Sequence, residues 1–237
     1  MLRVKEKLAR GESVSMVLVN YPSPALVEQL GRLGFDIAFI DCEKGSATTE
    51  RIEEMCRGAR AAGIAAIVRP WSNDPGLISR YLDLGADGVM VAAIEEVGAA
   101  RELVESVRYA RFRDYPDKLV IAMIESPRAI ENLPALLAVE GIDVWFVGPN
   151  DLAHRMGFPG QGDRVEVRDA VQQALRTIQA AGKIGGTLAS RESAVALQEA
   201  GARLLLTRVS ELLAHGARAF HSSLAPAEHA SPSKGPA

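Results

Sequence analysis

Residues 33–43 read LGFDIAFIDCE, and this stretch predicts the fold. Gly34 precedes an apolar run, Asp36–Asp41, that ends in acidic residues. Glycine is favoured just after a helix because it adopts the left-handed backbone conformation without strain. A strand that is apolar at nearly every position is buried on both faces, as in a parallel sheet. The same turn recurs as LGAD at residues 84–87 and EGID at residues 140–143, so one helix-to-strand unit is repeated along the chain.

Strand-length apolar runs alternate with longer amphipathic segments. About eight such units in a chain of 237 residues are typical of a closed barrel. An open, doubly wound sheet is the competing architecture, but no glycine-rich phosphate fingerprint follows the first apolar run. We therefore predict an α/β fold, a (β/α)8 TIM barrel, as one domain over residues 1–224, and a disordered Pro/Ser/Ala-rich tail over residues 225–237. The expected strands are Ser15–Asn20, Asp36–Asp41, Ala65–Pro70, Gly88–Ala92, Leu119–Glu125, Asp143–Gly148, Lys183–Leu188 and Arg203–Thr207.

Composition and charge argue against several classes of partner. The formal net charge is −3, Lys and Arg are scattered, and aromatic residues make up 5% of the chain, which is unlike a nucleic-acid-binding surface. The apolar runs are far shorter than the roughly 20 residues that cross a bilayer, and no apolar segment follows the charged N-terminus. The two cysteines form neither a disulfide framework nor a CxxC metal site. These features predict a cytoplasmic protein with no nucleic-acid or membrane partner.

Polar residues follow several of the predicted strands. In a barrel, the catalytic groups lie where strands end and the following loops begin. The segment Asp41–Lys44 follows the second strand, Arg69 ends the third, Glu125 ends the fifth and Asp151 follows the sixth. The mouth of the barrel is therefore expected to present carboxylates beside an arginine and a lysine.

Glu125 and Asp151 suggest a metal site. Each acid comes just after an apolar strand and close to a proline, with no paired His or Cys nearby, which favours a hard cation such as Mg²⁺ or Mn²⁺. Co²⁺ and Zn²⁺ are the alternatives. A 2-oxo acid can fill the vacant coordination positions with its carboxylate and ketone oxygens, and the cation then stabilises an enolate. Arg69 is expected to support the same developing oxyanion.

Structural explanations compete with this hypothesis. Asp151 could be the N-cap of a helix, and Glu125 could be an acid in the first turn of the next helix. Arg69 could be an ion-pair partner at the rim. The occurrence of both acids at neighbouring strand ends favours the metal site over these explanations.

Three further residues have less specific signals. Lys44 could be a Schiff-base nucleophile, a general base or an exposed charge beside Glu43. Asp83 lies near the end of a predicted helix, where an acid is usually solvated. Trp71 could pack in the core or form part of the pocket wall. None of the four histidines has ligand spacing with another, so no role is assigned to them.

Several motifs, in order from about Val14 to Phe220, resemble the HpcH/HpaI aldolase family. The matching motifs are Ile40-Asp41-Cys42-Glu43, Val68-Arg69-Pro70-Trp71-Ser72-Asn73-Asp74, Leu82-Asp83-Leu84-Gly85-Ala86, Ile124-Glu125-Ser126, Asn132-Leu133-Pro134 and Gly148-Pro149-Asn150-Asp151-Leu152. This resemblance implies a (β/α)8 barrel that cleaves 4-hydroxy-2-oxo acids to pyruvate and an aldehyde. It also implies hexamers, as trimers of dimers, that exchange a terminal helix.

The resemblance also implies site roles. It assigns a divalent metal to Glu125 and Asp151, and pyruvate binding to Arg69, next to the segment formed by Gly148, Pro149 and Asn150. The family's acid/base histidine, which works with the aspartate matching Asp83, is replaced here by Lys44. A lysine is charged near neutral pH unless its pKa is strongly lowered, so it is a better electrostatic anchor or proton donor than a base.

Other departures lie on the same side of the expected site. Met123 stands where the family commonly has glutamine, and Ala153 where it often has serine. The segment after Arg108 is also shorter than in the family. The metal and 2-oxo-acid half of the site is thus retained, and the half that handles protons and the aldehyde is altered.

These features lead to three hypotheses. The leading one is a class II, metal-dependent carbon–carbon lyase that uses Glu125 and Asp151 for metal, Arg69 for the enolate oxygen, and Lys44 with Asp83 for proton transfer or anchoring. The second is decarboxylation of a 2-oxo diacid such as oxaloacetate, which needs no base to remove a hydroxyl proton. The third is a non-catalytic barrel that binds a 2-oxo acid or a partner protein.

Overall fold

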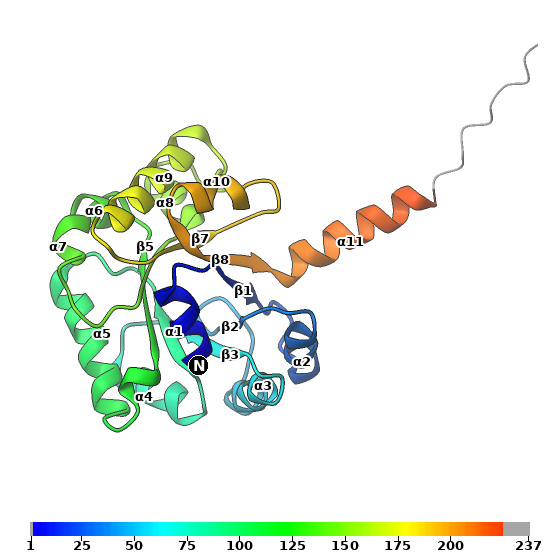
Figure 1. Ribbon diagram of the computed structural model, residues 1–237, viewed down its shortest axis with the longest axis horizontal. Coiled ribbons are helices and arrows are strands. Elements are labelled where there is room, and N and C mark those ends of the chain that lie inside the picture. Colours follow the sequence, from blue (N-terminus) through cyan, green and yellow to red (C-terminus); the bar gives the residue numbers. More distant parts are fainter. Residues whose placement is uncertain (1, 225–237) are drawn as a thin grey trace, which may run out of the picture.

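A computed structural model describes residues 2–224, which form a closed barrel of eight parallel strands in sequence order (Figure 1). Strand β1 pairs with both β2 and β8, which closes the ring. This confirms the predicted (β/α)8 barrel; the predicted tail over residues 225–237 lies outside the described residues. The strands are β1 (Val14–Leu18), β2 (Ile37–Asp41), β3 (Ala65–Arg69), β4 (Gly88–Val91), β5 (Leu119–Ile124), β6 (Val144–Val147), β7 (Gly185–Leu188) and β8 (Ala202–Arg208).

Most helices surround this ring in Figure 1, but α1 (Leu2–Ala9) packs Val4 and Leu8 against the residues inside the barrel. Helix α11 (Val209–Ser223) projects away from the barrel, as Figure 1 shows. A short helix precedes β1, and the helical segment after β5 is divided at Asn132, just before Pro134. The remaining helices are α2 (Pro24–Arg32), α3 (Thr49–Ala61), α4 (Pro75–Asp83), α5 (Val97–Ala110), α6 (Pro127–Glu131), α7 (Leu133–Leu136), α8 (Pro149–Arg155), α9 (Val165–Ala180) and α10 (Ala194–Glu199).

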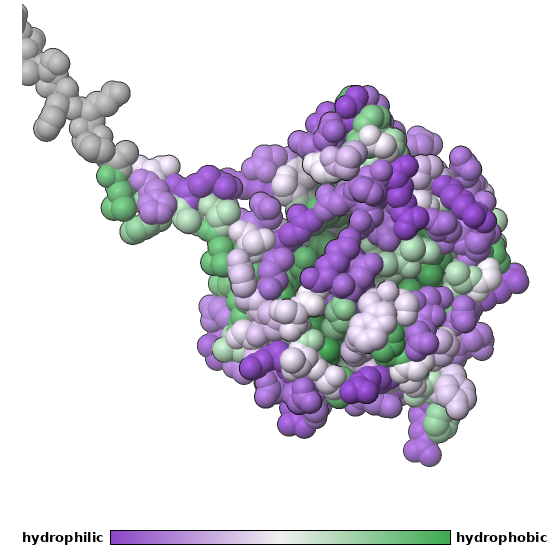
Figure 2. All heavy atoms as spheres, turned by 180° about the vertical axis from the view of Figure 1, so that it is seen from behind, coloured by the Kyte–Doolittle hydropathy of each residue, from purple (hydrophilic) through white to green (hydrophobic). Residues whose placement is uncertain are grey.

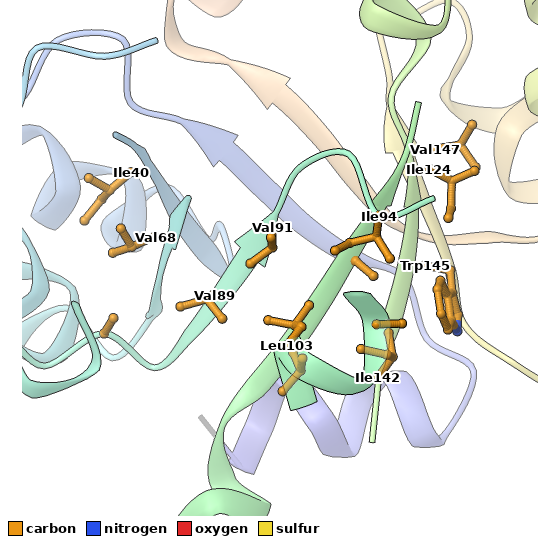
Figure 3. Packing of buried hydrophobic residues seen from close by; sticks show 14 of the residues in the cluster. Ile40, Val68, Val89, Val91, Ile94, Leu103, Ile124, Ile142, Trp145 and Val147 are labelled. Carbon is orange, nitrogen blue, oxygen red and sulfur yellow. The ribbon is translucent and has the colours of Figure 1, made fainter. Parts of the chain in front are cut away.

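The core has two layers because successive strand residues point to opposite faces. One set packs between the strands and the helices, as Figure 3 shows for Val89 and Val91 on β4 and Leu103 on α5. The other set fills the inside of the barrel and includes Phe39 and Phe146. No helix among the described residues is long and apolar enough to cross a membrane.

The inward-facing set also determines what reaches the mouth of the barrel. The residues inside the barrel include Phe39, Ile67, Met123, Phe146 and Leu206, one on each of five strands. On each of these strands, the next inward-facing residue lies two positions later. Those next residues are Asp41, Arg69, Glu125, Gly148 and Arg208. The alternation that builds the core therefore directs charged groups towards one end of the barrel.

Candidate active site

A cavity of about 270 Å³ opens at the carboxyl ends of the strands. Its deeper wall includes the rings of Phe39 and Phe146. Its polar lining comes from the ends of β2, β3 and β8 and from the segment that begins α8. The polar lining residues are Asn20, Asp41, Lys44, Arg69, Asn150, Asp151 and Arg208. Active sites of (β/α)8 enzymes lie at this end of the barrel, so this cavity is the candidate site.

Arg69 is held at the end of β3 by a buried, two-point contact with Asp41. The Nε of Arg69 donates to Oδ1 of Asp41 at 2.9 Å, and Nη2 donates to Oδ2 at 2.7 Å. Burial raises the pKa of Asp41, but the hydrogen bonds and charge of Arg69 and two backbone N–H groups outweigh that effect and hold the pKa below its usual value. Both groups are therefore charged at neutral pH, and Asp41 fixes the orientation of the guanidinium.

Glu43, for which the sequence predicted no role, is a second partner of Arg69. Its Oε2 lies 2.9 Å from Nη1 of Arg69 but is not aligned with it as a hydrogen bond. The same Nη1 makes a weak contact with the sulfur of Met123 at 3.8 Å. Nη1 therefore has no strong hydrogen bond from the protein, which leaves donors of Arg69 available on the cavity side.

Glu125 is a buried carboxylate in which one oxygen has a hydrogen-bond partner and the other has none. The residue is 4% exposed, and its Oε1 accepts a hydrogen bond of 2.9 Å from the backbone N–H of Ala93. Its Oε2 is buried and has no hydrogen-bond partner. Burial, and next the negative charge of Asp151, raise the pKa of Glu125. A buried carboxylate oxygen without a donor is costly and is suited to accept a cation.

The loop that satisfies Glu125 carries backbone strain. Ala93 has a φ of 55°, a left-handed conformation that costs an alanine roughly 1–2 kcal/mol. Its N–H is the group that donates to Glu125. Such strain persists when surrounding contacts require it. Because the strained Ala93 donates to Glu125, we infer that the surrounding structure holds the Glu125 carboxylate in a defined position.

Asp151 lies in the first turn of α8 and binds Lys44. Gly148 is the N-cap of this helix, so Asp151 is not the cap that the structural alternative expected. The Nζ of Lys44 lies 3.0 Å from both oxygens of Asp151. The backbone N–H groups of Glu43 and Lys44 both donate to Oδ1 of Asp41, which orders the loop that carries the lysine. Lys44 is therefore neither a solitary surface charge nor the partner of Asp83.

The two acids fit a hard divalent cation. The charge of Asp151 raises the pKa of Glu125, so an added positive charge near both would be favourable. Asp151 can accept from Lys44 and still offer lone pairs, because a carboxylate has about four acceptor sites. Among residues 2–224 no cluster of three or more His, Cys, Asp or Glu side chains could hold a metal. Two protein carboxylates leave positions for water and substrate, as is usual for Mg²⁺.

Gly148 lies directly against the Glu125 carboxylate, and this contact can be tested. A Cβ at residue 148 would lie 2.9 Å from Oε2 and 3.2 Å from Cβ of Glu125. Gly148→Ala should therefore displace the carboxylate, lower the affinity for Mn²⁺ about 10-fold or more and leave the fold intact. Calorimetric titration with Mn²⁺ measures this effect. Gly98→Ala is the matched control, because a Cβ there meets no atom within 4 Å; equal Mn²⁺ affinities in the two variants would contradict the role of Glu125.

Two expected site residues are not at this cavity. Asp83 is the last residue of α4, which runs back from the end of β3 to the start of β4, so it lies at the opposite end of the barrel. Its side chain is 69% exposed and contacts Arg111 at 3.4 Å. Trp71 is 61% exposed and does not line the cavity. Within this chain, Asp83 therefore does not contact Lys44, and Trp71 does not line the cavity.

The structure brings together the other expected residues and adds new ones. Arg69, Lys44, Gly148, Pro149, Asn150 and Asp151 line the cavity, and Glu125 lies behind Gly148. Arg208 and Asn20 also line it, although the sequence analysis did not single them out. The inward alternation along β8 is the signal that could have identified Arg208. No histidine is among the residues that line the cavity.

Comparisons with known proteins match this chain to one family. Residues 14–216 match the HpcH/HpaI aldolase/citrate lyase family. A 4-hydroxy-2-oxo-heptane-1,7-dioate aldolase from Shigella sonnei is 33% identical over 91% of this chain and 92% of its own. A hydroxypyruvate/pyruvate aldolase from Delftia acidovorans is 30% identical over 79% of this chain and 78% of its own. The solved structure of the citrate synthase SbnG has a TM-score of 0.84 and 26% identity, and the match covers 93% of this chain and 97% of that one. These names indicate aldolase or lyase chemistry in a family whose reactions vary.

Proposed function

The chain belongs to the HpcH/HpaI aldolase/citrate lyase family, and we propose that it is a divalent-metal-dependent lyase that cleaves or forms 4-hydroxy-2-oxo acids through a pyruvate enolate. The observation that carries the proposal is the unpartnered Oε2 of Glu125, which lies near Asp151 and near the fixed guanidinium of Arg69. A cation-binding carboxylate and an oxyanion donor are the two groups that enolate chemistry requires.

The reaction breaks the bond between C3 and C4 of the substrate. The 4-hydroxyl group loses its proton as C4 becomes the aldehyde carbon, and the electron pair of the broken bond moves to C3 and the C2 oxygen. The resulting enolate gains a proton at C3 to give pyruvate. Negative charge therefore develops at the C2 oxygen, which is where a preorganised donor lowers the barrier most.

Each retained residue has a place in this scheme. Glu125 and Asp151 would hold the cation, with Mg²⁺ or Mn²⁺ preferred, and the bound ion would supply Lewis-acid polarisation of the 2-oxo acid. Arg69 donates to the C2 oxygen, and Asp41 keeps it oriented. Lys44 is an electrostatic anchor beside Asp151. The rings of Phe39 and Phe146 limit water at the deep end of the cavity.

A cleavage assay tests this proposal. Release of pyruvate from a panel of 4-hydroxy-2-oxo acids is measured with Mg²⁺ or Mn²⁺ and with EDTA, and the aldehyde is quantified in parallel. The expected result is metal-dependent release of pyruvate and aldehyde in equal amounts. Binding of metal and pyruvate without any turnover would instead favour a non-catalytic barrel.

The second candidate is decarboxylation of a 2-oxo diacid such as oxaloacetate. Two observations favour it: among residues 2–224 no histidine lines the cavity, and Lys44 is bound to Asp151. Decarboxylation needs no base to remove a hydroxyl proton, so it tolerates this arrangement. Metal-dependent decarboxylation of oxaloacetate with no aldehyde formed from hydroxy-oxo acids would select this candidate.

We also propose that the chain forms a homo-oligomer through α11. Leu213 and Phe220 on this helix are 58% and 62% exposed, and Leu224, just after its end, is 62% exposed; hydrophobic atoms are visible along the projecting helix in Figure 2. Such a helix face is usually covered by another surface. The family resemblance leads us to propose a hexamer in which this helix is exchanged between copies.

Charge on α11 should disrupt that assembly. The double substitution Leu213→Glu and Phe220→Glu is expected to convert the oligomer to smaller species, because each glutamate would have to be buried in the interface. Light scattering coupled to size-exclusion chromatography measures the mass. Leu33→Glu, on another exposed apolar residue, should leave the mass unchanged; a monomeric unsubstituted protein would contradict the proposal.

A further inference from the structure

Arg208 is a cation of the cavity that the proposed chemistry does not use. It ends β8, where Leu204 and Leu206 point into the barrel, and it continues that inward-facing series at the mouth. It lines the same cavity as Arg69 and Lys44. Its register partner on β1 is Leu18, which offers no charge to pair with it.

The guanidinium of Arg208 differs from the other cations of the cavity in its partners. Arg69 is bound by Asp41 and Glu43, and Lys44 is bound by Asp151. Within the part of the chain that the structure describes, the Arg208 side chain makes no ion pair or hydrogen bond. A half-buried guanidinium whose donors face a cavity is available to bind an anion there.

Helix stability does not explain an arginine at this position. Arg208 is the N-cap residue of α11, and its side chain makes no capping hydrogen bond. A positive charge is unfavourable at a helix N-terminus because the helix dipole is positive there. The cap interaction is made instead by Asn20, whose Oδ1 accepts from the backbone N–H and hydroxyl of Ser210.

The position of Arg208 in the ring shows which part of a substrate it could reach. Arg69 lies on β3, Glu125 follows β5 and Asp151 follows β6, whereas β8 lies across the ring, between β7 and β1. The 2-oxo-acid end of a substrate would lie against Arg69, Glu125 and Asp151. The substituent on C4, which becomes the aldehyde product, then extends towards β8. The wall there is otherwise mainly apolar and includes Leu18, Leu188 and Leu206.

We propose that Arg208 is a specificity-determining residue that binds a carboxylate on the C4 substituent, so that the enzyme selects aldehydes bearing an acidic group over neutral ones. For the reaction itself, this inference rests on the proposed function. The binding of the acidic group by Arg208 does not depend on it. A guanidinium binds a carboxylate through two parallel hydrogen bonds, which gives both affinity and orientation.

The first arm of the test compares two acceptors in the synthetic direction. The enzyme is assayed with pyruvate and either 4-oxobutanoate or the uncharged pentanal, with Mn²⁺ present. Arg208→Gln is expected to lower kcat/KM about 10- to 100-fold for 4-oxobutanoate and to change it less than about 2-fold for pentanal. The kcat/KM of Arg208→Lys for 4-oxobutanoate should lie between those of the unsubstituted enzyme and Arg208→Gln. Arg101→Gln, on the exposed face of α5, is the control for loss of a positive charge.

The second arm is a binding measurement that needs no turnover. Calorimetry in the presence of Mn²⁺ compares 2-oxoglutarate with 2-oxopentanoate, which lacks the second carboxylate. The unsubstituted protein should prefer 2-oxoglutarate about 10-fold or more, and Arg208→Gln should lose that preference. If Arg208→Gln changed the kcat/KM values or the affinities equally for charged and neutral compounds in either arm, or changed neither, the role of Arg208 would be overturned. Failure of turnover with an intact binding preference would overturn the proposed function alone.

Discussion

Glu125→Gln is expected to lower metal-dependent turnover at least about 100-fold and, at the same time, to stabilise the metal-free protein. The loss of activity follows from removal of a charged oxygen that would hold the cation. The gain in stability follows from burial, since an ionised carboxylate with an unpartnered oxygen is costly to bury. A gain of about 1 kcal/mol corresponds to roughly 2–4 °C in Tm for a chain of this size.

The pH dependence of that gain has a definite sign. The folded-state pKa of Glu125 is raised, so its ionisation destabilises the metal-free fold at pH values above that pKa. The penalty disappears as the pH falls through the folded pKa. Glu125→Gln should therefore stabilise the protein at neutral pH and lose this advantage as the medium becomes acidic.

Thermal unfolding with EDTA and with Mn²⁺ separates these effects. Mn²⁺ should raise the Tm of the unsubstituted protein and have no effect on Glu125→Gln. Asp151→Asn is the informative comparison: it should also lose the Mn²⁺ effect but gain less stability, because Asp151 is more exposed and already binds Lys44. A Glu125→Gln protein that retained both full activity and the Mn²⁺ effect would exclude Glu125 as a ligand.

Arg69→Gln is expected to lower kcat about 10²- to 10³-fold, as removal of an oxyanion donor does in other enzymes. It should also destabilise the fold by about 3–5 kcal/mol, because Asp41 is left as a buried charge without its partner. Chemical denaturation and steady-state kinetics measure the two effects separately. Arg69→Lys keeps the charge but cannot reproduce the two-point contact, so it should lose activity as well.

A double substitution distinguishes catalysis from structure at this position. Asp41→Asn combined with Arg69→Gln removes both buried charges and should recover most of the lost stability. Activity should stay low, because the donor to the enolate oxygen is still absent. Recovery of activity together with stability would show that Arg69 serves only to neutralise Asp41.

The fold was predictable because the strands are buried on both faces. Continuous apolar runs such as Ile37–Asp41 and Leu119–Ile124 have few competing interpretations, and all eight strands were located within a few residues. The positions of Arg69, Glu125 and Asp151 followed from the rule that barrel chemistry lies at strand ends. Which side chains bind which others was not predictable from the sequence. Lys44 was expected to work with Asp83 but instead binds Asp151, 107 residues away.

The positions of Asp83 and Trp71 away from the cavity have physical explanations. Asp83 ends a helix that returns to the start of the next strand, so it faces the end of the barrel opposite the cavity. Trp71 follows Pro70 beyond the end of β3, and it is 61% exposed. Glu43 was recognised only as part of the motif Ile40-Asp41-Cys42-Glu43 and was given no role, and Arg208 belongs to no motif. The importance of Glu43 depends on the burial of its Oε2, and that of Arg208 depends on its inward-facing position on β8.

The central claim is that this site generates a pyruvate enolate. Exchange of the methyl protons of pyruvate in D₂O, followed by NMR, measures enolate formation without any aldehyde. We expect exchange with Mg²⁺ or Mn²⁺ that is suppressed by EDTA and in Glu125→Gln and Arg69→Gln. An unsubstituted protein that binds Mn²⁺ and pyruvate but shows no exchange above the protein-free rate would contradict it.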